Sequence, residues 1–224
     1  NFNKLDAVLT ISESSKDEIL NYTKIKSSQI YNISAACDKN LFNLDISSID
    51  SLKIHSQDFG KYILYTGAVD PRKNLYRLIK AYSSLPLILL LKHKLVLTGP
   101  YSKTEIKLIH SWIAECNLSL QNIIILGFVS DHDLASLYKN SYLFVFPSLH
   151  EGFGLPVLEA MNCGAPVIAS NCTSIPEIIK FDSALFNPYN IDEIKGLILK
   201  VLTDKEFYNL VKKNSQIRMK SFSW

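Results

Sequence analysis

The stretch YILYTGAVDPRKNLYRLIKAYSS, residues 62–84, contains the pattern that most of the chain repeats. Residues 62–66 form a short apolar run that ends at Gly67, and a helix is predicted from about Asn74 to Ser84. A continuous apolar run bounded by glycine is typical of a strand that is buried on both faces. The stretch therefore predicts a strand, a loop and a helix in succession.

The same alternation continues to the end of the chain. Further strands are predicted at 94–98, 122–126, 142–146, 166–169 and 184–186, and helical segments at about 103–116, 131–139, 155–162, 176–179, 191–203 and 204–220. Strands that alternate with helices at this spacing form βαβ units around a parallel sheet. We therefore predict an α/β fold with a Rossmann-like, doubly wound parallel sheet for residues 61–224. In such a sheet, ligands bind at the carboxyl ends of the strands.

Residues 1–34 precede this pattern and have predicted elements of their own. A strand is predicted at 5–11, a helix at about 16–22, and a second strand at 29–33. Residues 35–60 lose this periodicity and contain Asn, Asp and Ser, so we interpret them as a linker between two domains.

The composition is that of an ordinary globular protein. Hydrophobic residues make up 47% of the 224 positions, and the net charge is only +3. No block of Lys or Arg is present, which argues against nucleic acid as a partner. None of the four cysteines forms a C-x-x-C pair, so a metal site is not expected. Since the chain starts at Asn1 rather than Met and stops abruptly at Trp224, we expect it to be a piece of a longer protein.

The most specific chemistry lies in FPSLHEGFGLPVLEAMNCGAPVIASNCTSIPE, residues 146–177. Glu151 ends the loop after a predicted strand, and Pro156 suits the first turn of the helix that follows. The N–H groups of residues 153–155 would then form an anion site that suits a phosphate. Glu159 lies about one turn into that helix, where its carboxylate can accept two hydrogen bonds from a ribose diol. An isolated glutamate is usually solvated, but the apolar neighbours of Glu159 favour an engaged carboxylate.

The segment EGFGLPVLE, residues 151–159, resembles the E-x7-E motif of retaining GT-B glycosyltransferases, and the sequence around it resembles glycosyltransferase family 4. YTGAVDPRKNLYRLIKAY (65–82), KLVLTGP (94–100) and IIILGFVSDHDLASLY (123–138) are similar to successive units of the family's C-terminal domain. LDAVLTISESSKDEI (5–19) is similar to the end of its N-terminal domain. The resemblance implies that residues 1–34 end an acceptor domain and that residues 61–224 bind the nucleotide sugar.

The resemblance also implies roles for matching residues. Glu159 would bind the ribose, Glu151 would contact the donor sugar near its anomeric end, and Lys73 would neutralise the diphosphate leaving group. Ala68 stands where the family often has an arginine, so Arg72 would supply the second cation. Further donor contacts are expected from Gly152, Phe153, Gly154, Leu155, Gly67, Gly99, Gly127, Phe128, Val129 and Ser174.

The reaction that the resemblance implies is transfer of a hexose, with retention of anomeric configuration, from a nucleotide-diphosphate sugar to a glycan or glycolipid acceptor. GDP-mannose is favoured over a UDP-sugar, and no metal or other cofactor is expected. The enzyme would be cytoplasmic, with contact to the inner face of the membrane. The fragment alone would be inactive, because the missing N-terminal domain supplies the other wall of the active site.

Two other functions stay open on the sequence alone. One is a nucleotide-sugar-binding module without transfer activity, and the other is a different GT-B enzyme such as a sugar-nucleotide epimerase. A role for His150, which precedes Glu151, also stays open.

Overall fold

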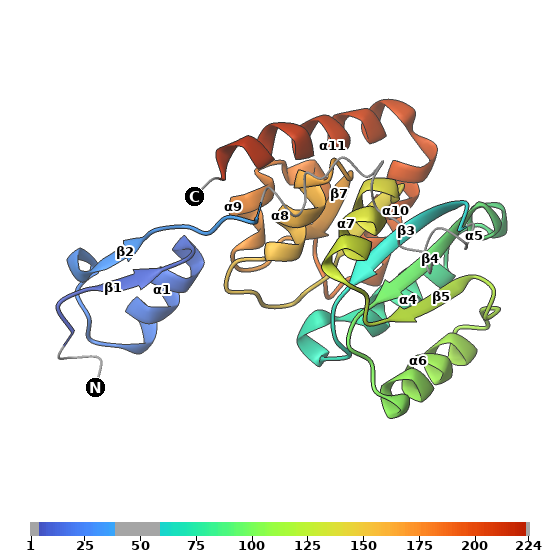
Figure 1. Ribbon diagram of the computed structural model, residues 1–224, viewed down its shortest axis with the longest axis horizontal. Coiled ribbons are helices and arrows are strands. Elements are labelled where there is room, and N and C mark those ends of the chain that lie inside the picture. Colours follow the sequence, from blue (N-terminus) through green and yellow to red (C-terminus); the bar gives the residue numbers. More distant parts are fainter. Residues whose placement is uncertain (1–4, 39–58, 223–224) are drawn as a thin grey trace.

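The computed structural model describes residues 5–38 and 59–222, which form two parts (Figure 1). Residues 5–38 form the smaller part, called the N-terminal module below. Its elements are β1 (Val8–Thr10), α1 (Glu13–Tyr22), the 3-10 turn η2 (Ser27–Gln29) and β2 (Ile30–Asn32). The two strands pair in parallel, with Leu9 opposite Tyr31. An extended segment leads from β2 toward the larger part (Figure 1).

The larger part is built on a six-stranded sheet in which all paired strands are parallel. Its strands are β3 (Lys61–Thr66), β4 (His93–Thr98), β5 (Ile123–Gly127), β6 (Leu143–Phe146), β7 (Val167–Ser170) and β8 (Leu185–Phe186). Their order in the sheet is β5-β4-β3-β6-β7-β8, so the direction of winding reverses between β3 and β6. This order confirms the predicted doubly wound α/β fold and places the switch point between the loops that follow β3 and β6.

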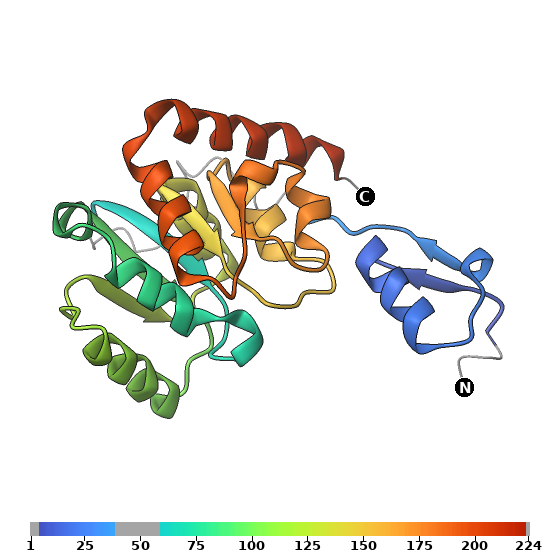
Figure 2. The same ribbon diagram turned by 180° about the vertical axis from the view of Figure 1, so that it is seen from behind.

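Helices cover both faces of the sheet. They are α4 (Leu75–Ser83), α5 (Leu87–Lys92), α6 (Lys103–Glu115), α7 (Asp131–Asn140), α8 (Leu155–Asn162), α9 (Ile175–Ile179), α10 (Ile191–Thr203) and α11 (Lys205–Arg218). Three 3-10 turns, η4 (Pro71–Lys73), η5 (Asp182–Ala184) and η6 (Met219–Ser221), complete the larger part. α4, α6 and α10 lie over one face (Figure 2), while α7 and α8 lie over the other (Figure 1).

The apolar runs form the core because both faces of the sheet are covered. Ile63, Leu64 and Tyr65 of β3 are fully buried, and so are all four residues of β6. Four helices of the larger part, α6, α7, α10 and α11, follow residues whose side chains accept from free backbone amides, such as Ser102 before α6 and Asp204 before α11.

Two helices differ most from the prediction. No element is predicted between residues 84 and 94, but α5 forms there after Pro86, with Leu89 and Leu90 buried. α1 begins at Glu13, three residues before the predicted start, because the Ser12 side chain accepts from the Ser15 amide and caps the helix there. Most of the predicted linker, residues 39–58, lies outside the described residues. Within residues 5–38 and 59–222, no helix combines the length and the apolar character that crossing a bilayer requires.

Candidate functional site

Lys73 and Glu151 form an ion pair beside the switch point of the sheet. Lys73 ends η4 in the loop after β3, and Glu151 lies in the loop after the adjacent strand β6. The Lys73 Nζ atom lies 2.6 Å from Glu151 Oε1, and the two side chains are 23% and 15% exposed. The same Nζ atom lies 5.5 Å from the centre of the Phe146 ring. Because each charge compensates the other away from bulk water, an anion that enters the site must compete with Glu151 for Lys73.

Backbone contacts hold these two loops together. The Leu149 amide donates to the Arg72 carbonyl at 2.7 Å. Asn74 Nδ2 donates to the carbonyls of Pro147 at 3.0 Å and Pro188 at 2.8 Å. Asn74 has a φ of 59°, a left-handed conformation that asparagine tolerates better than most residues. The residue after Lys73 therefore fixes the position of the loop that carries Glu151.

Arg72, which the sequence predicts as a second cation, is held by Asp70. Its Nε and Nη2 atoms lie 3.2 and 2.9 Å from the two carboxylate oxygens of Asp70, and its side chain is 64% exposed. These hydrogen bonds lower the pKa of Asp70. Lys73 and Arg72 therefore differ in their surroundings, because Lys73 is half-buried against Glu151 while Arg72 faces solvent.

Glu159 lies in α8 and accepts a hydrogen bond from Tyr138 of α7 at 3.3 Å. Burial raises the pKa of the Glu159 carboxyl, and the charge of Asp131 raises it further, whereas the Tyr138 hydrogen bond lowers it. Burial and the charge of Glu159 raise the pKa of Tyr138, whereas the side chain of Thr66 lowers it, so the hydroxyl stays protonated and donates. Tyr138 and Thr66 are not among the residues predicted from the sequence, although a buried tyrosine hydroxyl usually has a partner.

Ser174 holds the loop between Glu151 and α8. Its hydroxyl lies 3.0 Å from the Glu151 carbonyl oxygen and 2.6 Å from that of Phe153. The Thr173 hydroxyl accepts from the Glu151 amide at 3.0 Å. The Ser174 hydroxyl, which the sequence predicts to contact the donor, is thus directed at two carbonyl oxygens of this loop. Thr173, which the sequence analysis did not predict, has a similar part.

The loop between Glu151 and α8 has its phenylalanine side chain buried and, within the part of the chain that the structure describes, its backbone amides unpaired. The Phe153 ring is buried and packs edge-on against Phe222, with ring centres 5.8 Å apart. Gly154 has a φ of 112°, and a Cβ there would lie 2.5 Å from Ile175 Cδ1. Among the described residues, the amides of 152–155 donate to no carbonyl or side chain. These amides lie at the start of α8, where a helix favours an anion.

Three predicted glycines, Gly67, Gly99 and Gly127, are side by side at the ends of β3, β4 and β5. The Gly67 amide donates to the Thr98 carbonyl, and the Gly99 amide donates to the Gly127 carbonyl, both at 3.0 Å. A Cβ on Gly99 would lie 2.2 Å from the Gly67 carbonyl oxygen, so only glycine fits there. The Thr98 hydroxyl also donates to the Gly127 carbonyl at 2.9 Å.

The Gly127 carbonyl oxygen thus already accepts two hydrogen bonds, which leaves the backbone of Phe128 and Val129 as the part of this loop available to a ligand. The Phe128 side chain is 81% exposed.

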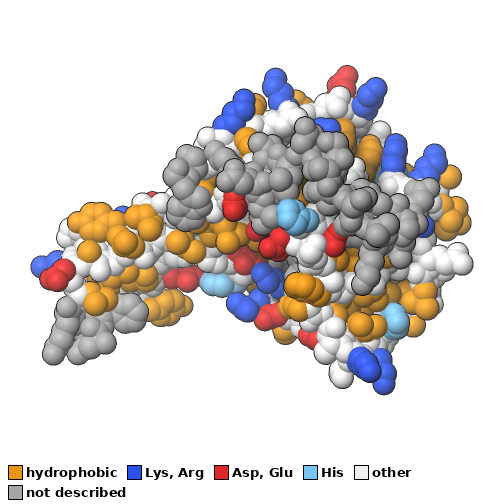
Figure 3. Space-filling view, viewed as in Figure 1, with side chains coloured by type: hydrophobic (Ala, Val, Ile, Leu, Met, Phe, Trp, Pro, Cys, Tyr) orange, Lys and Arg blue, Asp and Glu red, His pale blue; other side chains and the backbone are white. Residues whose placement is uncertain are grey.

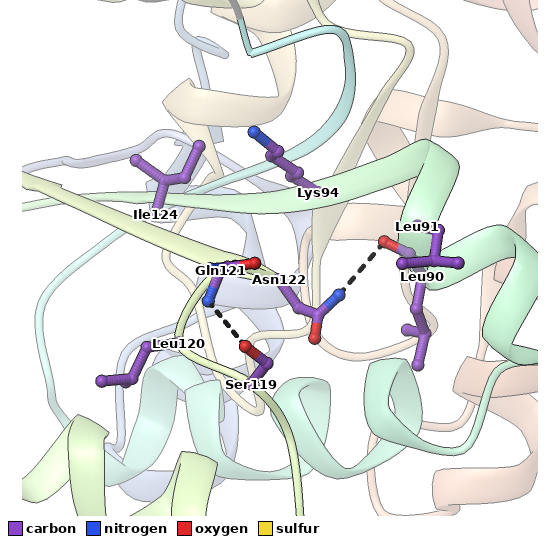
Figure 4. A pocket seen from close by; sticks show the side chains of 8 residues that line it. All are labelled: Leu90, Leu91, Lys94, Ser119, Leu120, Gln121, Asn122 and Ile124. Carbon is purple, nitrogen blue, oxygen red and sulfur yellow. Dashed lines mark hydrogen bonds between the residues drawn. The ribbon is translucent and has the colours of Figure 1, made fainter.

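A pocket of about 450 Å³ lies at the opposite edge of the sheet, beside the starts of β4 and β5 (Figure 4). It is lined by Leu90, Leu91, Lys94, Ser119, Leu120, Gln121, Asn122 and Ile124. Lys94 is its one charged lining residue, so it does not bring together the groups that acid–base or phosphate chemistry needs. In the described parts of the chain, no three His, Cys, Asp or Glu side chains are grouped so that they could hold a metal ion.

Known proteins are similar to this chain in sequence and in fold. The family described as Glycosyl transferases group 1 matches residues 50–218. The serotype-specific mannosyltransferase WbdA of Escherichia coli is 40% identical over all of this chain, which covers 28% of WbdA. The O-antigen chain mannosyltransferase B of E. coli is 34% identical over 97% of this chain, which covers 57% of that relative. The chain therefore spans between a quarter and three-fifths of these curated relatives.

Solved structures have the same arrangement of elements. The crystal structure of Anabaena HepE in complex with UDP and glucose superposes with a TM-score of 0.82 at 22% identity, over 97% of this chain and 59% of that one. Sucrose-phosphate synthase from Thermosynechococcus elongatus superposes with a TM-score of 0.83 at 24% identity, over 98% of this chain and 54% of that one. These likenesses show the GT-B fold. Together with the match over residues 50–218, they establish that the chain belongs to the glycosyl transferases group 1 family.

Proposed function

We propose that this chain is the donor-binding part of a retaining, family 4 glycosyltransferase that transfers mannose from a nucleotide-diphosphate sugar. The observation that carries the proposal is the Lys73–Glu151 pair beside the unpaired amides at the start of α8. Both features lie at the carboxyl edge of the sheet, where ligands of doubly wound folds bind.

The chemistry of the transfer suits these groups. When the bond between the anomeric carbon and the diphosphate breaks, the leaving group gains negative charge. In this proposal, Lys73 and the amides of 152–155 stabilise that charge. The acceptor hydroxyl forms the new bond to the anomeric carbon, and its proton passes to the leaving phosphate. In this scheme the protein's own cation and amides take the place of a metal, so chelation by EDTA should leave the rate unchanged.

Glu159 and Glu151 divide the recognition of the donor. Glu159 binds the two ribose hydroxyls, because a carboxylate can accept both hydrogen bonds. Glu151 releases Lys73 to the diphosphate and contacts the sugar. The base lies against the backbone of Phe128 and Val129.

Mannose is supported by the names of the two E. coli relatives, both mannosyltransferases. The O-antigen chain in the name of one of them supports a glycan or glycolipid acceptor. We propose GDP-mannose as the donor. We also propose that a further domain, which precedes the N-terminal module, binds the acceptor.

A nucleotide screen tests the proposal. Isothermal calorimetry on this chain should show that GDP binds more tightly than UDP or ADP. Glu159→Ala should weaken GDP binding about tenfold or more, because it removes hydrogen bonds to a charged acceptor. Glu105→Ala, which changes a glutamate on α6, is the matched control and should leave the affinity unchanged. A folded chain that binds none of the three nucleotides would overturn the donor-site proposal.

The longer protein allows a test of stereochemistry. NMR of the first product from GDP-mannose should show the α-anomer, the configuration of the donor. A β-linked product would contradict retention.

A further inference from the structure

The N-terminal module contacts the loop that carries Glu151. The hydroxyl oxygens of Ser12 and Ser15 lie 2.7 and 3.2 Å from the carbonyl oxygen of Gly152. Ser12 is only 1% exposed, and a Cβ on Gly152 would lie 3.8 Å from Ile11 Cδ1. Acidic, basic and histidine side chains also meet where the module adjoins the larger part (Figure 3). The start of α1 therefore packs directly on this loop.

Glu177 holds the start of α1 from the side of α9. Its two carboxylate oxygens accept from the amides of Glu13 at 2.9 Å and Ser14 at 2.8 Å. The next amide, that of Ser15, donates to the Ser12 hydroxyl at 3.0 Å. The first three amides of α1 are thus all paired, and a carboxylate at a helix N-terminus is favourable.

α9, in turn, is tied to the last long helix. Arg218 of α11 donates to the carbonyl oxygens of Glu177 at 3.0 Å and Ile178 at 2.7 Å. Asn214 donates to the Ile179 carbonyl at 2.9 Å. Hydrogen bonds to α11 therefore hold α9 in place, and the Glu177 carboxylate on α9 holds the start of α1.

The contacts to the carbonyl groups of residues 151–153 determine where the amides of residues 152–154 point. In a planar trans peptide, the N–H group points opposite to the C=O group. The Gly152 carbonyl faces α1, so the Phe153 amide points away from α1. The carbonyls of Glu151 and Phe153 face Ser174, so the amides that follow them point away from Ser174.

We propose that the start of α1 is a positioning element for the transfer reaction. Ser12 and Ser15 hold the Gly152 carbonyl so that the Phe153 amide points toward the donor. Glu177 keeps α1 in the position from which the hydroxyls of Ser12 and Ser15 reach that carbonyl. This inference rests on the proposed function, because it assigns the aimed amide to the donor. The N-terminal module would thereby act on the donor site as well as on the acceptor side.

Amide hydrogen exchange tests the positioning without any ligand. In the Ser12→Ala/Ser15→Ala double variant, and in Glu177→Gln, the hydrogen-bonded amides of Leu149 and Glu151 should exchange about tenfold faster or more. Ser28→Ala, an exposed serine of the same module, is the matched control and should leave that exchange unchanged. If the double variant exchanges at the wild-type rate, α1 does not hold the loop and the inference is wrong.

Kinetics on the longer protein tests the consequence for transfer. The double serine variant should lower kcat about tenfold to a hundredfold, because small misplacements of stabilising groups cost this much. The dissociation constant for GDP should rise by a much smaller factor than kcat falls, since Glu159 and Lys73 still bind the nucleotide. Glu177→Asp should recover part of the kcat that Glu177→Gln loses. Equal losses of kcat and GDP affinity would mean a general structural defect and would overturn the inference.

The two proposals fail in different ways. A wild-type protein that binds no nucleotide would sink the proposed function, while the exchange experiment would still decide whether α1 holds the loop.

Discussion

The carboxylate of Glu159 has opposite effects on stability and on binding. Burial raises its pKa, so the ionised form that a ribose requires is the form that the empty protein disfavours. The folded pKa lies above the unfolded value of about 4.5, and the folded protein therefore binds more protons across that interval. It follows that the carboxylate lowers the stability of the empty protein as pH rises through this window.

Glu159→Gln should therefore stabilise the empty protein at neutral pH while it weakens nucleotide binding. The gain in Tm should be absent well below pH 4.5, grow as pH rises above it, and then level off once the carboxyl is ionised. Thermal unfolding between pH 4 and pH 8 measures this directly. Glu105, whose pKa is lowered by its hydrogen bonds to Ser102, is a control of opposite sign, since Glu105→Gln should lose stability as pH rises. A Glu159→Gln gain that is the same at every pH would contradict the assignment.

Lys73 and Arg72 are neighbours in the sequence, but the structure predicts unequal effects for their removal. Lys73→Ala should lower kcat/KM of the longer protein by about 2–4 kcal/mol of transition-state stabilisation, roughly thirtyfold to a thousandfold. Arg72→Ala should cost less than about fivefold, because its guanidinium is exposed and already bonded to Asp70. Steady-state kinetics with GDP-mannose decides between them, with circular dichroism to confirm folding. A larger loss for Arg72→Ala would reverse the roles of the two cations.

At the scale of elements, the ends of β3, β4 and β5 depend on a close backbone approach. Gly99→Ala places a Cβ 2.2 Å from the Gly67 carbonyl oxygen, so one strand end must move. We expect a loss of about 1–3 kcal/mol in the free energy of unfolding, together with weaker nucleotide binding, because the Gly67 loop leads to Lys73. Gly196→Ala is the control: its Cβ meets nothing within 4 Å inside α10, and alanine should stabilise that helix by about 0.5–1 kcal/mol. Urea denaturation of both variants tests the pair, and a neutral Gly99→Ala would show that the strand ends adapt.

The elements that could be predicted from the sequence are those with local signals. α8 begins at Leu155 and ends at Asn162, as predicted, because Gly154 and Pro156 mark its start. α5 lacks such signals: its leucines give an apolar run without a polar face, and no capping side chain precedes it. Tertiary packing of Leu89 and Leu90 forms that helix, which sequence periodicity does not reveal.

The candidate site shows the same limit. The sequence predicts that Lys73 and Glu151 both contact the donor, but it does not predict their ion pair, which forms because their loops follow the adjacent strands β3 and β6. The contacts that hold the loops were not predicted, since Ser174 and Tyr138 act on atoms distant in the sequence. A serine hydroxyl directed at a ligand and one directed at a carbonyl look alike in a sequence, so only the fold distinguishes them.

At the scale of the whole molecule, the N-terminal module has an apolar face that the described residues leave uncovered. Leu9, Tyr31 and Ile33 are 63%, 54% and 56% exposed, and Leu9 pairs with Tyr31 across the two strands. Parallel sheets are normally covered on both faces, and a two-stranded sheet alone is at best marginally stable. This face therefore supports the proposal that residues 1–34 end a larger domain.

Polar substitution of that face should leave the stability of the 224-residue chain almost unchanged but lower that of the longer protein. In the 224-residue chain, Leu9→Ser with Tyr31→Thr should change the free energy of unfolding by less than about 0.5 kcal/mol, because exposed positions tolerate change. Binding of a hydrophobic dye should fall. In the longer protein, the same pair should destabilise the N-terminal domain by about 2–5 kcal/mol, since both side chains would be buried against preceding elements. Leu210→Ser, at an exposed leucine of α11, should be neutral in both proteins. If the double variant is neutral in the longer protein as well, the face is not covered by a preceding domain, and the division of the chain at residue 34 must be redrawn.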